Sequence, residues 1–253
     1  MATTQDLVIE EILAIDIGAT SIKSCLVDHE GRLLEARRRR PTPYPCTPER
    51  LVALLNDRIA RSAVTRVGVG FPGEFTEGRV VHPGNLSRPG GVNSAVDPAL
   101  ARSWEGFELQ KVLAAATGRD VRIVNDATLA ALGCCGDQGR EIVFTLGTGF
   151  GLALSVDGEI QKVRDVGAEE FADGRTYDQD LGEQGRARDE AHWRTLVERA
   201  ITGFVKEFRA DVAHLAGGNA RRLSPDMFSS IPCPITIVGN EAALKGAARL
   251  FQD

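Results

Sequence analysis

The chain has 253 residues, of which 43% are hydrophobic and 26% are charged, with a formal net charge of −5. This balance is typical of globular domains and unlike that of a disordered chain. Mild acidity argues against general nucleic-acid binding, and no apolar run approaches the roughly 20 residues of a membrane helix. Residues 1–11 lack the basic and apolar regions of a signal peptide, so we expect a cytoplasmic protein without nucleic-acid or membrane partners.

The cysteines and histidines are scattered along the sequence. The five cysteines form no CxxC pair, and the four histidines lie far apart in the chain. Because tetrahedral zinc sites need clustered ligands, we expect reduced, structural cysteines and no structural zinc. The residues are Cys25, Cys46, Cys134, Cys135, Cys233, His29, His82, His192 and His214.

Residues 11–60 contain three predicted strands and a helix. Apolar runs on both sides of a turn at Gly18 predict two strands within residues 11–27. Residues 32–40 suit a third strand, which a cluster of prolines ends. Residues 48–60 carry a helical apolar stripe with Pro48 at its start.

Residues 66–135 are predicted to contain two strands and two helices. Residues 66–71 form a short buried strand, and residues 121–125 form a second one. Residues 74–103 are rich in Gly, Pro and Asn and are expected to be irregular, whereas residues 104–117 predict a helix. A further helix begins at Asp126 and runs to about Cys135.

The opening pattern of strand, glycine turn and strand recurs about 130 residues later, which indicates an internal duplication. Apolar runs at 141–146 and 152–156 flank the glycine turn 147–151, and residues 159–163 add a third strand. After this repeat, residues 169–191 are almost wholly polar and are expected to form a long loop. The remaining predicted elements are an amphipathic helix at 193–208, strands at 212–216 and 235–238, and a terminal helix from Asn240.

The two glycine turns are suited to cradle phosphates from two sides. Glycine allows close backbone approach, and successive N–H groups form an anion-binding nest. Asp16, at the end of the first strand, is suited to coordinate Mg²⁺ directly or through water. Neither turn matches the dinucleotide-binding or P-loop motif.

Asn125 and Asp126 lie between a predicted strand and a predicted helix. One interpretation is structural: Asp126 caps the helix by accepting backbone N–H bonds. The other is functional: Asp126 is a general base that takes the proton of a substrate hydroxyl. Local sequence slightly favours the cap and leaves both open.

Four segments, in order along the chain, resemble motifs of the ROK family of sugar kinases in the actin/Hsp70/sugar-kinase superfamily. The branch most similar to this chain contains the polyphosphate/ATP-dependent glucokinases. The segments are Asp-Ile-Gly-Ala-Thr (16–20) for the first phosphate motif, Val-Asn-Asp-Ala (124–127) for the catalytic segment, Leu-Gly-Thr-Gly-Phe-Gly (146–151) for the second phosphate motif and Ala-Gly-Gly-Asn (216–219) for the turn beside adenosine.

The resemblance implies an α/β, two-domain actin-like (ribonuclease H-like) ATPase fold with an interdomain cleft. Residues 1–125, including a sugar lid and completed by the helix 241–253, would form one domain, and residues 126–240 the other. The implied activity is transfer of a phosphoryl group from ATP or polyphosphate to a hexose hydroxyl, with Mg²⁺ as cofactor, in a homodimer.

The resemblance also assigns site residues. Asp126 would be the base. The sugar would be held by Gly73, Asn85, Asn125, Asp126, Asp165 and Glu170. The donor phosphates would face Asp16, Gly18, Ala19, Thr20, Lys23, Gly147, Thr148 and Gly149, with Asp16 also serving Mg²⁺. Adenosine would lie near Gly217, Gly218 and Asn219.

Some positions depart from the family pattern. Ala19 stands where the first phosphate motif usually has glycine. In the sugar-binding segment, Asp165 is one methylene shorter than the usual Glu, and Ala168 replaces a His, whereas Glu170 matches. A site that loses hydrogen-bond partners loses discrimination between sugars. Asp180 and Glu183 are candidates for replacement contacts.

Other interpretations remain open from the sequence. The departures also suit a catalytically weak sugar-sensing or regulatory protein of the same fold, and a type III pantothenate kinase has a similar length and superfamily. The cationic run Arg37–Arg40 suits either a polyphosphate-docking strand or, with more weight, a solvated edge strand.

Overall fold

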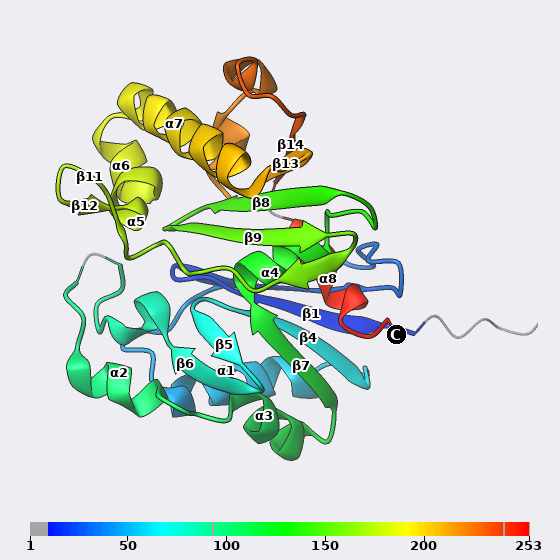
Figure 1. The fold of residues 1–253 in the computed structure, drawn as a ribbon. Helices are drawn as coiled ribbons and strands as arrows, with labels where there is room; N and C mark the ends of the chain where they lie inside the picture. Colours follow the sequence, from blue (N-terminus) through cyan, green and yellow to red (C-terminus); the bar gives the residue numbers. More distant parts are fainter. Residues whose placement is uncertain (1–9, 93, 240, 253) are drawn as a thin grey trace, which may run out of the picture.

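In the computed structural model, which describes residues 10–92, 94–239 and 241–252, two five-stranded sheets share one topology. The first sheet has the order β3-β2-β1-β4-β7, and the second has the order β10-β9-β8-β13-β14. In both, an antiparallel meander leads into parallel strands. The internal duplication predicted from the glycine turns is therefore confirmed at the level of the sheets (Figure 1).

The strands of the first sheet are β1 (Ile12–Ile17), β2 (Ser21–Val27), β3 (Arg38–Pro41), β4 (Arg66–Phe71) and β7 (Asp120–Asn125). Those of the second sheet are β8 (Arg140–Leu146), β9 (Phe150–Val156), β10 (Glu159–Gln161), β13 (Val212–Ala216) and β14 (Ile235–Gly239). β3 is an edge strand whose four residues are all exposed, which agrees with the solvated-edge interpretation of the arginine run. The strand is shorter than the one predicted for residues 32–40.

Helices cover the outer face of each sheet. The apolar sides of α1 (Pro48–Ala60) and α3 (Leu109–Thr117) share one hydrophobic core with the first sheet. The long helix α7 (Glu190–Phe208) packs on the second sheet through the face predicted from its periodicity. α1 has Pro48 in its first turn, as the sequence predicts, and the structure adds an N-cap at Thr47.

A third core joins the two halves of the chain. α4 (Asp126–Leu132) and α8 (Ala242–Arg249) lie between the two sheets (Figure 1). α8 packs on β1 and β2 of the first sheet, and α4 packs on β8 and β9 of the second. The helices approach each other so closely that a Cβ on Gly246 would collide with the carbonyl oxygen of Leu129, and a Cβ on Gly133 with that of Ala242. Glycine at these two positions permits backbone-to-backbone packing.

Two predicted segments in the first half of the chain differ from the structure. Residues 74–103 contain the hairpin β5 (Glu74–Thr76) and β6 (Arg79–His82), the 3₁₀ turn η1 (Gly84–Ser87) and α2 (Pro98–Trp104). The single helix predicted for 104–117 is interrupted after Trp104, where Gly106 takes a positive φ of 69°. The predicted start of the terminal helix, Asn240, lies outside the described residues.

The polar segment 169–191, predicted as a loop, is folded. It contains β11 (Glu170–Ala172), β12 (Arg175–Thr176), α5 (Tyr177–Leu181) and α6 (Glu183–Arg188). Thr176 begins α5 with a capping box, and the buried Asp180 binds Arg175 and Arg188 at 2.7 and 3.2 Å. Ion pairs and caps hold these short elements, so the segment lacks the apolar periodicity that predicts them. After β13 come the 3₁₀ turns η2 (Ala220–Arg222) and η3 (Pro225–Phe228).

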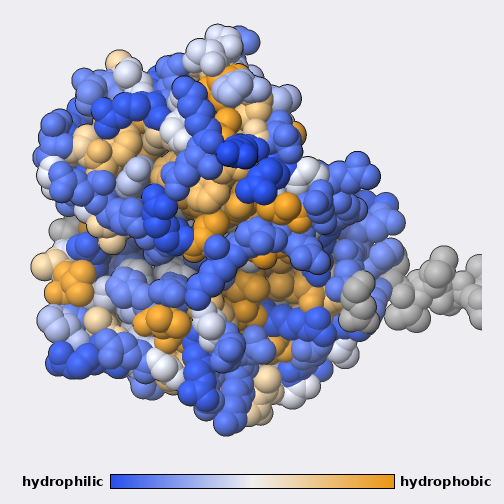
Figure 2. Space-filling model, viewed as in Figure 1, coloured by the Kyte–Doolittle hydropathy of each residue, from blue (hydrophilic) through white to orange (hydrophobic). Residues whose placement is uncertain are grey.

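Hydrophilic residues dominate the face of the molecule shown in Figure 2, and hydrophobic atoms are visible where the two halves meet. Within the described residues, no helix has both the length and the apolar character needed to cross a bilayer.

Candidate active site

The predicted motifs meet because equivalent strand ends share one edge of each sheet. β1, β4 and β7 run parallel, so the residues that follow them, Gly18, Pro72 and Asp126, lie along one edge of the first sheet. β8 and β13 are likewise parallel, which brings Gly147 and Gly217 to one edge of the second sheet.

The two glycine turns contact each other across the halves of the chain. The hydroxyl oxygens of Thr20 and Thr148 lie 2.7 Å apart. The first turn is anchored from the loop after β3, because the Thr42 hydroxyl donates to the Gly18 carbonyl and the Tyr44 hydroxyl donates to the Ala19 carbonyl, each at 2.6 Å. The sequence analysis missed Thr42 and Tyr44; their position after the strand carries no motif.

Asp16 and Lys23 form an ion pair at the base of the first turn. They are cross-strand partners in the β1–β2 register, and Lys23 Nζ lies 2.7 Å from Asp16 Oδ2. Both side chains are largely buried, with exposed fractions of 10% for Asp16 and 21% for Lys23. A carboxylate and an ammonium group thus stand together at the place predicted for the donor phosphates.

Asn125, not Asp126, caps helix α4. The Asn125 side-chain oxygen accepts the N–H groups of Ala127 and Thr128 at 2.9 and 3.2 Å. Asp126 is the first helical residue, and its carboxylate accepts only the adjacent N–H of Ala127, at 2.8 Å, among the hydrogen bonds of the described residues. The cap interpretation therefore applies to the neighbouring residue.

The surroundings of Asp126 favour its protonated form. Burial, followed by the negative charge of Asp16, raises the pKa of Asp126 to about 7. The Ala127 N–H lowers the pKa, Asp165 raises it further and Lys23 opposes that rise. A carboxyl group with this pKa is poised to accept a proton near neutral pH.

Gly73 lies beside Asn125, and Asn85 lies in the turn that packs on Gly73. Asn125 Nδ2 donates to the Gly73 carbonyl at 2.8 Å, and Gly73 has a φ of 155° with no room for a Cβ against the His82 carbonyl oxygen. Asn85 follows Gly84, whose backbone packs on Pro72 and Gly73. The structure therefore brings Gly73 to Asn125, next to Asp126, and places Asn85 in the adjoining turn; their role in holding a sugar stays a prediction.

Asp165 and Glu170 have different surroundings. Asp165 is exposed, accepts the Gly167 N–H at 3.0 Å, and is close enough to Asp126 to raise the pKa of that carboxyl group. Glu170 lies in β11 and accepts the Gly174 N–H at 3.2 Å within its own hairpin. Ala168 is exposed between them. Their assignment to the sugar also stays a prediction.

Asp178 is a buried carboxylate that the sequence analysis missed. Its Oδ1 accepts the Phe150 N–H at 2.8 Å, and its carboxylate fills the space that a Cβ on Gly149 or Gly167 would need. Burial raises the pKa of Asp178, while the Phe150 N–H opposes the rise. Asp178 thus links the second glycine turn to the segment that carries Asp165.

The candidate adenosine turn is fastened to the second glycine turn. Asn219 donates from its backbone N–H to the Leu146 carbonyl and from Nδ2 to the Gly147 carbonyl, both at 2.9 Å. Gly217 has a φ of 90° and packs its Cα against Leu146. The turn formed by Gly217, Gly218 and Asn219 therefore lies directly beside Gly147.

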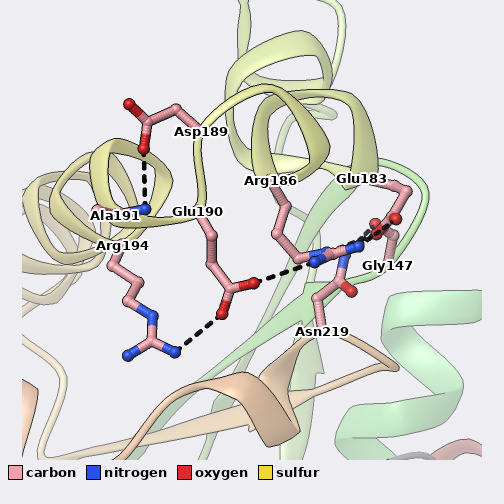
Figure 3. Close-up of polar contacts among 8 residues, drawn as sticks. All are labelled: Gly147, Glu183, Arg186, Asp189, Glu190, Ala191, Arg194 and Asn219. Carbon is pink, nitrogen blue, oxygen red and sulfur yellow. Dashed lines mark hydrogen bonds and ion pairs between the residues drawn. The ribbon is translucent and has the colours of Figure 1, made fainter.

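A chain of ion pairs supports these turns from α6 and α7 (Figure 3). Arg186 binds Glu183 at 2.6 Å and Glu190 at 3.2 Å, and Glu190 binds Arg194 at 2.9 Å. The Glu183 N–H donates to the Thr148 carbonyl at 3.1 Å. Both replacement candidates are held in ion pairs: Glu183 pairs with Arg186, and Oδ1 of Asp180 binds Arg175 and Arg188. The other oxygen of Asp180, Oδ2, is buried and has no hydrogen-bond partner among the described residues.

The expectation of dispersed cysteines and histidines is wrong at one place. The thiols of Cys134 and Cys135 and the ring of His214 place their metal-binding atoms within 4.8 Å of one another. Packing of the segment after α4 against β13 brings together residues that are far apart in the chain. The expected absence of structural zinc therefore loses its basis.

Comparison with known proteins agrees with this architecture. A family model described as "ROK family" matches residues 12–169. A glucokinase of Streptomyces coelicolor is 32% identical over 197 residues, which cover 74% of this chain and 58% of that protein. The match thus spans somewhat more than half the length of this curated relative.

Two solved structures have the same fold. The polyphosphate/ATP-glucomannokinase of Arthrobacter sp. strain KM has a TM-score of 0.76 and 30% identity, and the alignment covers 95% of this chain and 97% of that one. A ROK-family glucokinase of Streptomyces griseus, in complex with glucose and AMPPNP, has a TM-score of 0.70 and 19% identity over 95% and 98% of the two chains. The predicted two-domain, actin-like fold class is confirmed.

Proposed function

The chain belongs to the ROK family, and we propose that it is a sugar kinase that transfers the terminal phosphoryl group of ATP or polyphosphate to a hydroxyl of a glucose-like hexose. Asp126 is the general base. The sugar oxygen forms a bond to the terminal phosphorus, the bond from that phosphorus to the leaving phosphate breaks, and the hydroxyl proton moves to the Asp126 carboxylate.

The observation that carries this proposal is the place of Asp126. It stands next to the edge where two phosphate-type turns touch through Thr20 and Thr148, and its pKa is raised to about 7. The neighbouring Asn125 supplies the helix cap, so the local fold does not require a carboxylate at position 126. A carboxylate kept at a position where burial disfavours its negative charge is typical of a catalytic group.

The residues on both sides of the contact between the threonines suit a phosphate chain. Ala19 and Thr20 offer backbone N–H groups and a hydroxyl from one half, and Thr148 and Gly149 offer the same from the other. The N–H groups of Gly18 and Gly147 close the two turns by donating to the carbonyls of Ser21 and Gly149. Lys23 adds a positive charge. Phosphoryl transfer needs this kind of positioning and charge stabilisation more than covalent chemistry.

The carboxylate of Asp16 fits Mg²⁺. Mg²⁺ is usually held by one or two carboxylates together with substrate phosphates and water, and Asp16 is a largely buried carboxylate at the donor-phosphate turn. Bound there, the ion would neutralise the negative charge that develops on the phosphates. Asp16 would hold the ion either while it remains paired with Lys23 or after Lys23 has left it to bind the donor phosphates.

A hexose would lie between Asp126 and the segment from Asp165 to Glu170. Gly73, Asn85 and Asn125 would contact it from the first half of the chain, and Asp165 and Glu170 from the second. The glucokinase and glucomannokinase relatives favour a glucose-like acceptor. Ala168 removes one polar contact, so we expect weaker discrimination among hexoses than a complete set of partners would give.

A donor-by-acceptor activity matrix tests the proposal. Purified protein is assayed with ATP and with polyphosphate against glucose, mannose and N-acetylmannosamine, with the Asp126→Asn variant beside it. Phosphorylation of a hexose by the wild type and its loss in the variant are expected. Sugar binding without turnover on either donor would instead favour a sugar-sensing protein, and equal turnover by the variant would refute Asp126 as the base. Membership in the ROK family argues against a type III pantothenate kinase.

A further inference from the structure

A second group of reactive side chains lies away from the candidate active site, at the other end of helix α4. Cys134 and Cys135 follow this helix, and His214 lies in the middle of β13. The two Sγ atoms and a ring nitrogen of His214 all lie within 4.8 Å of one another. We call these three residues, together with Glu141 of β8, the thiol–histidine cluster.

Glu141 holds both sides of the cluster in place. Its Oε2 lies 2.6 Å from Nε2 of His214, and its Oε1 accepts the N–H of Gly136 at 2.7 Å. The His214 and Glu141 side chains are about nine-tenths buried, with exposed fractions of 9% and 10%. One carboxylate therefore orients the imidazole ring and also fixes the backbone just after the two cysteines.

Two buried polar atoms, one in the cluster and one on the neighbouring strand, have no partner among the described residues. Nδ1 of His214 is buried and has no hydrogen-bond partner among the described residues. Ser155 lies opposite Glu141 in the β8–β9 register, and its hydroxyl oxygen is also buried and has no hydrogen-bond partner among the described residues. Buried polar atoms normally find a partner, so these atoms point to a missing ligand or water.

From these contacts we propose that Cys134, Cys135 and His214 bind one Zn²⁺ ion, with Glu141 as the positioning carboxylate. Two thiolates and an imidazole are ligands that zinc prefers, and around a tetrahedral zinc such atoms lie about 3.5–3.8 Å apart. The observed spread within 4.8 Å needs only a small contraction. A metal-binding histidine that gives its other ring nitrogen to a carboxylate is the usual arrangement, and Glu141 supplies that partner.

The position of this site suggests what the metal does. It ties the end of α4 to β8 and β13, and α4 begins with Asp126. The ion would stabilise the second sheet against the helix that carries the candidate base. This site is built by residues from three separate elements and is independent of the proposed kinase activity, so either proposal can fail without the other.

Metal analysis tests the site directly. Protein loaded with one equivalent of Zn²⁺ and then dialysed is expected to retain about one zinc per chain by mass spectrometry, because thiolate and imidazole ligands hold structural zinc tightly. Cys135→Ser and His214→Gln are expected to lose it. Cys233→Ser, which removes a buried cysteine outside the cluster, is the matched control and is expected to retain it.

Two further measurements keep the test decisive if a variant is unstable. Chelation of the wild type is expected to lower Tm, and added Zn²⁺ to restore it. Glu141→Gln is expected to weaken zinc affinity by about 10- to 100-fold, as for other carboxylates that position a metal-binding histidine. The proposal would be overturned if the dialysed wild type held no zinc and its Tm did not change under chelation. Equal zinc retention by Cys135→Ser and the wild type would overturn it as well. Either result would leave a buried water as the partner of His214.

Discussion

The hydroxyl oxygens of Thr20 and Thr148 lie 2.7 Å apart, although 128 residues separate them in the chain. Each threonine belongs to the glycine turn of one sheet, so the contact joins equivalent points of a duplicated structure. A donor phosphate bound between the turns would replace this hydroxyl-to-hydroxyl bond with two bonds to phosphate oxygens.

We predict that Thr20 and Thr148 act together on the phosphoryl donor. Thr20→Val and Thr148→Val should each raise KM for the donor, and the double variant should depart from additivity by about 0.5–3 kcal/mol, as contacting residues do. Steady-state kinetics of the four proteins measures this coupling. Thr195→Val, at an exposed site of α7, is the matched control. Strict additivity would show that the two hydroxyls contribute separately.

Asp126→Asn should reduce kcat by about 10²–10⁴-fold, the usual contribution of a positioned base, with a smaller change in KM for the sugar. The amide keeps the shape of the side chain and still accepts the Ala127 N–H, so the fold should persist. Asp120→Asn, at an exposed position of the strand that leads to Asp126, should leave the kinetics unchanged. A variant with more than half of the wild-type kcat would contradict the role of Asp126.

Activity should depend on pH through Asp126. The carboxyl group works as a base only when deprotonated, so kcat/KM should rise with pH and level off above its pKa of about 7. Asp165→Asn removes a negative charge that raises this pKa and should move the rising limb to lower pH. A pH profile that is flat between 5 and 8, or a shift in the opposite direction, would exclude Asp126 as the titrating group.

The same pKa predicts how stability changes with pH. Between the ordinary value of 3.8 and about 7, the folded protein holds a proton on Asp126 that the unfolded chain has lost. The contribution of Asp126 to the free energy of unfolding therefore decreases as pH rises across this window. Asp126→Asn should remove that decrease and gain stability relative to wild type at pH 8, measured by urea denaturation at pH 5 and pH 8. An equal difference at both pH values would contradict the raised pKa.

Gly149→Ala should disturb the second glycine turn. The new methyl group would collide with the Asp178 carboxylate, which would have to leave its bond to the Phe150 N–H. We expect a loss of about 1–3 kcal/mol of unfolding free energy, as for other buried hydrogen bonds that are broken, and a higher KM for the donor. Gly203→Ala in α7 has open space and should gain up to about 1 kcal/mol. Equal stability of the two variants would show that Asp178 can move freely.

Asn219 should distinguish the two donors. It holds its turn against Leu146 and Gly147 at the place proposed for adenosine. Asn219→Ala should raise KM for ATP several-fold and change KM for polyphosphate much less, because polyphosphate has no nucleoside. Kinetics with both donors on the same preparation measures the ratio. An equal loss with both donors would mean that Asn219 acts by supporting Gly147 and the phosphates.

The sequence predicts the fold and the site where motif and periodicity coincide. The repeated glycine turns and alternating apolar runs predict both sheets, and the four motifs meet at the strand ends as expected. The folded segment with α5 and α6 is missed, because capping by Thr176 and the ion pairs of Asp180 replace apolar periodicity there. Asp178 and the thiol–histidine cluster are missed because they depend on tertiary packing between distant elements.

The close approach of α4 and α8 at Gly133 and Gly246 has a mechanical consequence. No side chain from Gly133 or Gly246 interlocks with the facing helix, so we expect the two helices to shift against each other by small amounts more easily here than at contacts between long side chains. Both helices lie between the sheets, so their crossing is a natural pivot for turning one half against the other. A small rotation of the two halves about this helix contact would then separate Thr20 from Thr148 and open the space for a phosphoryl donor.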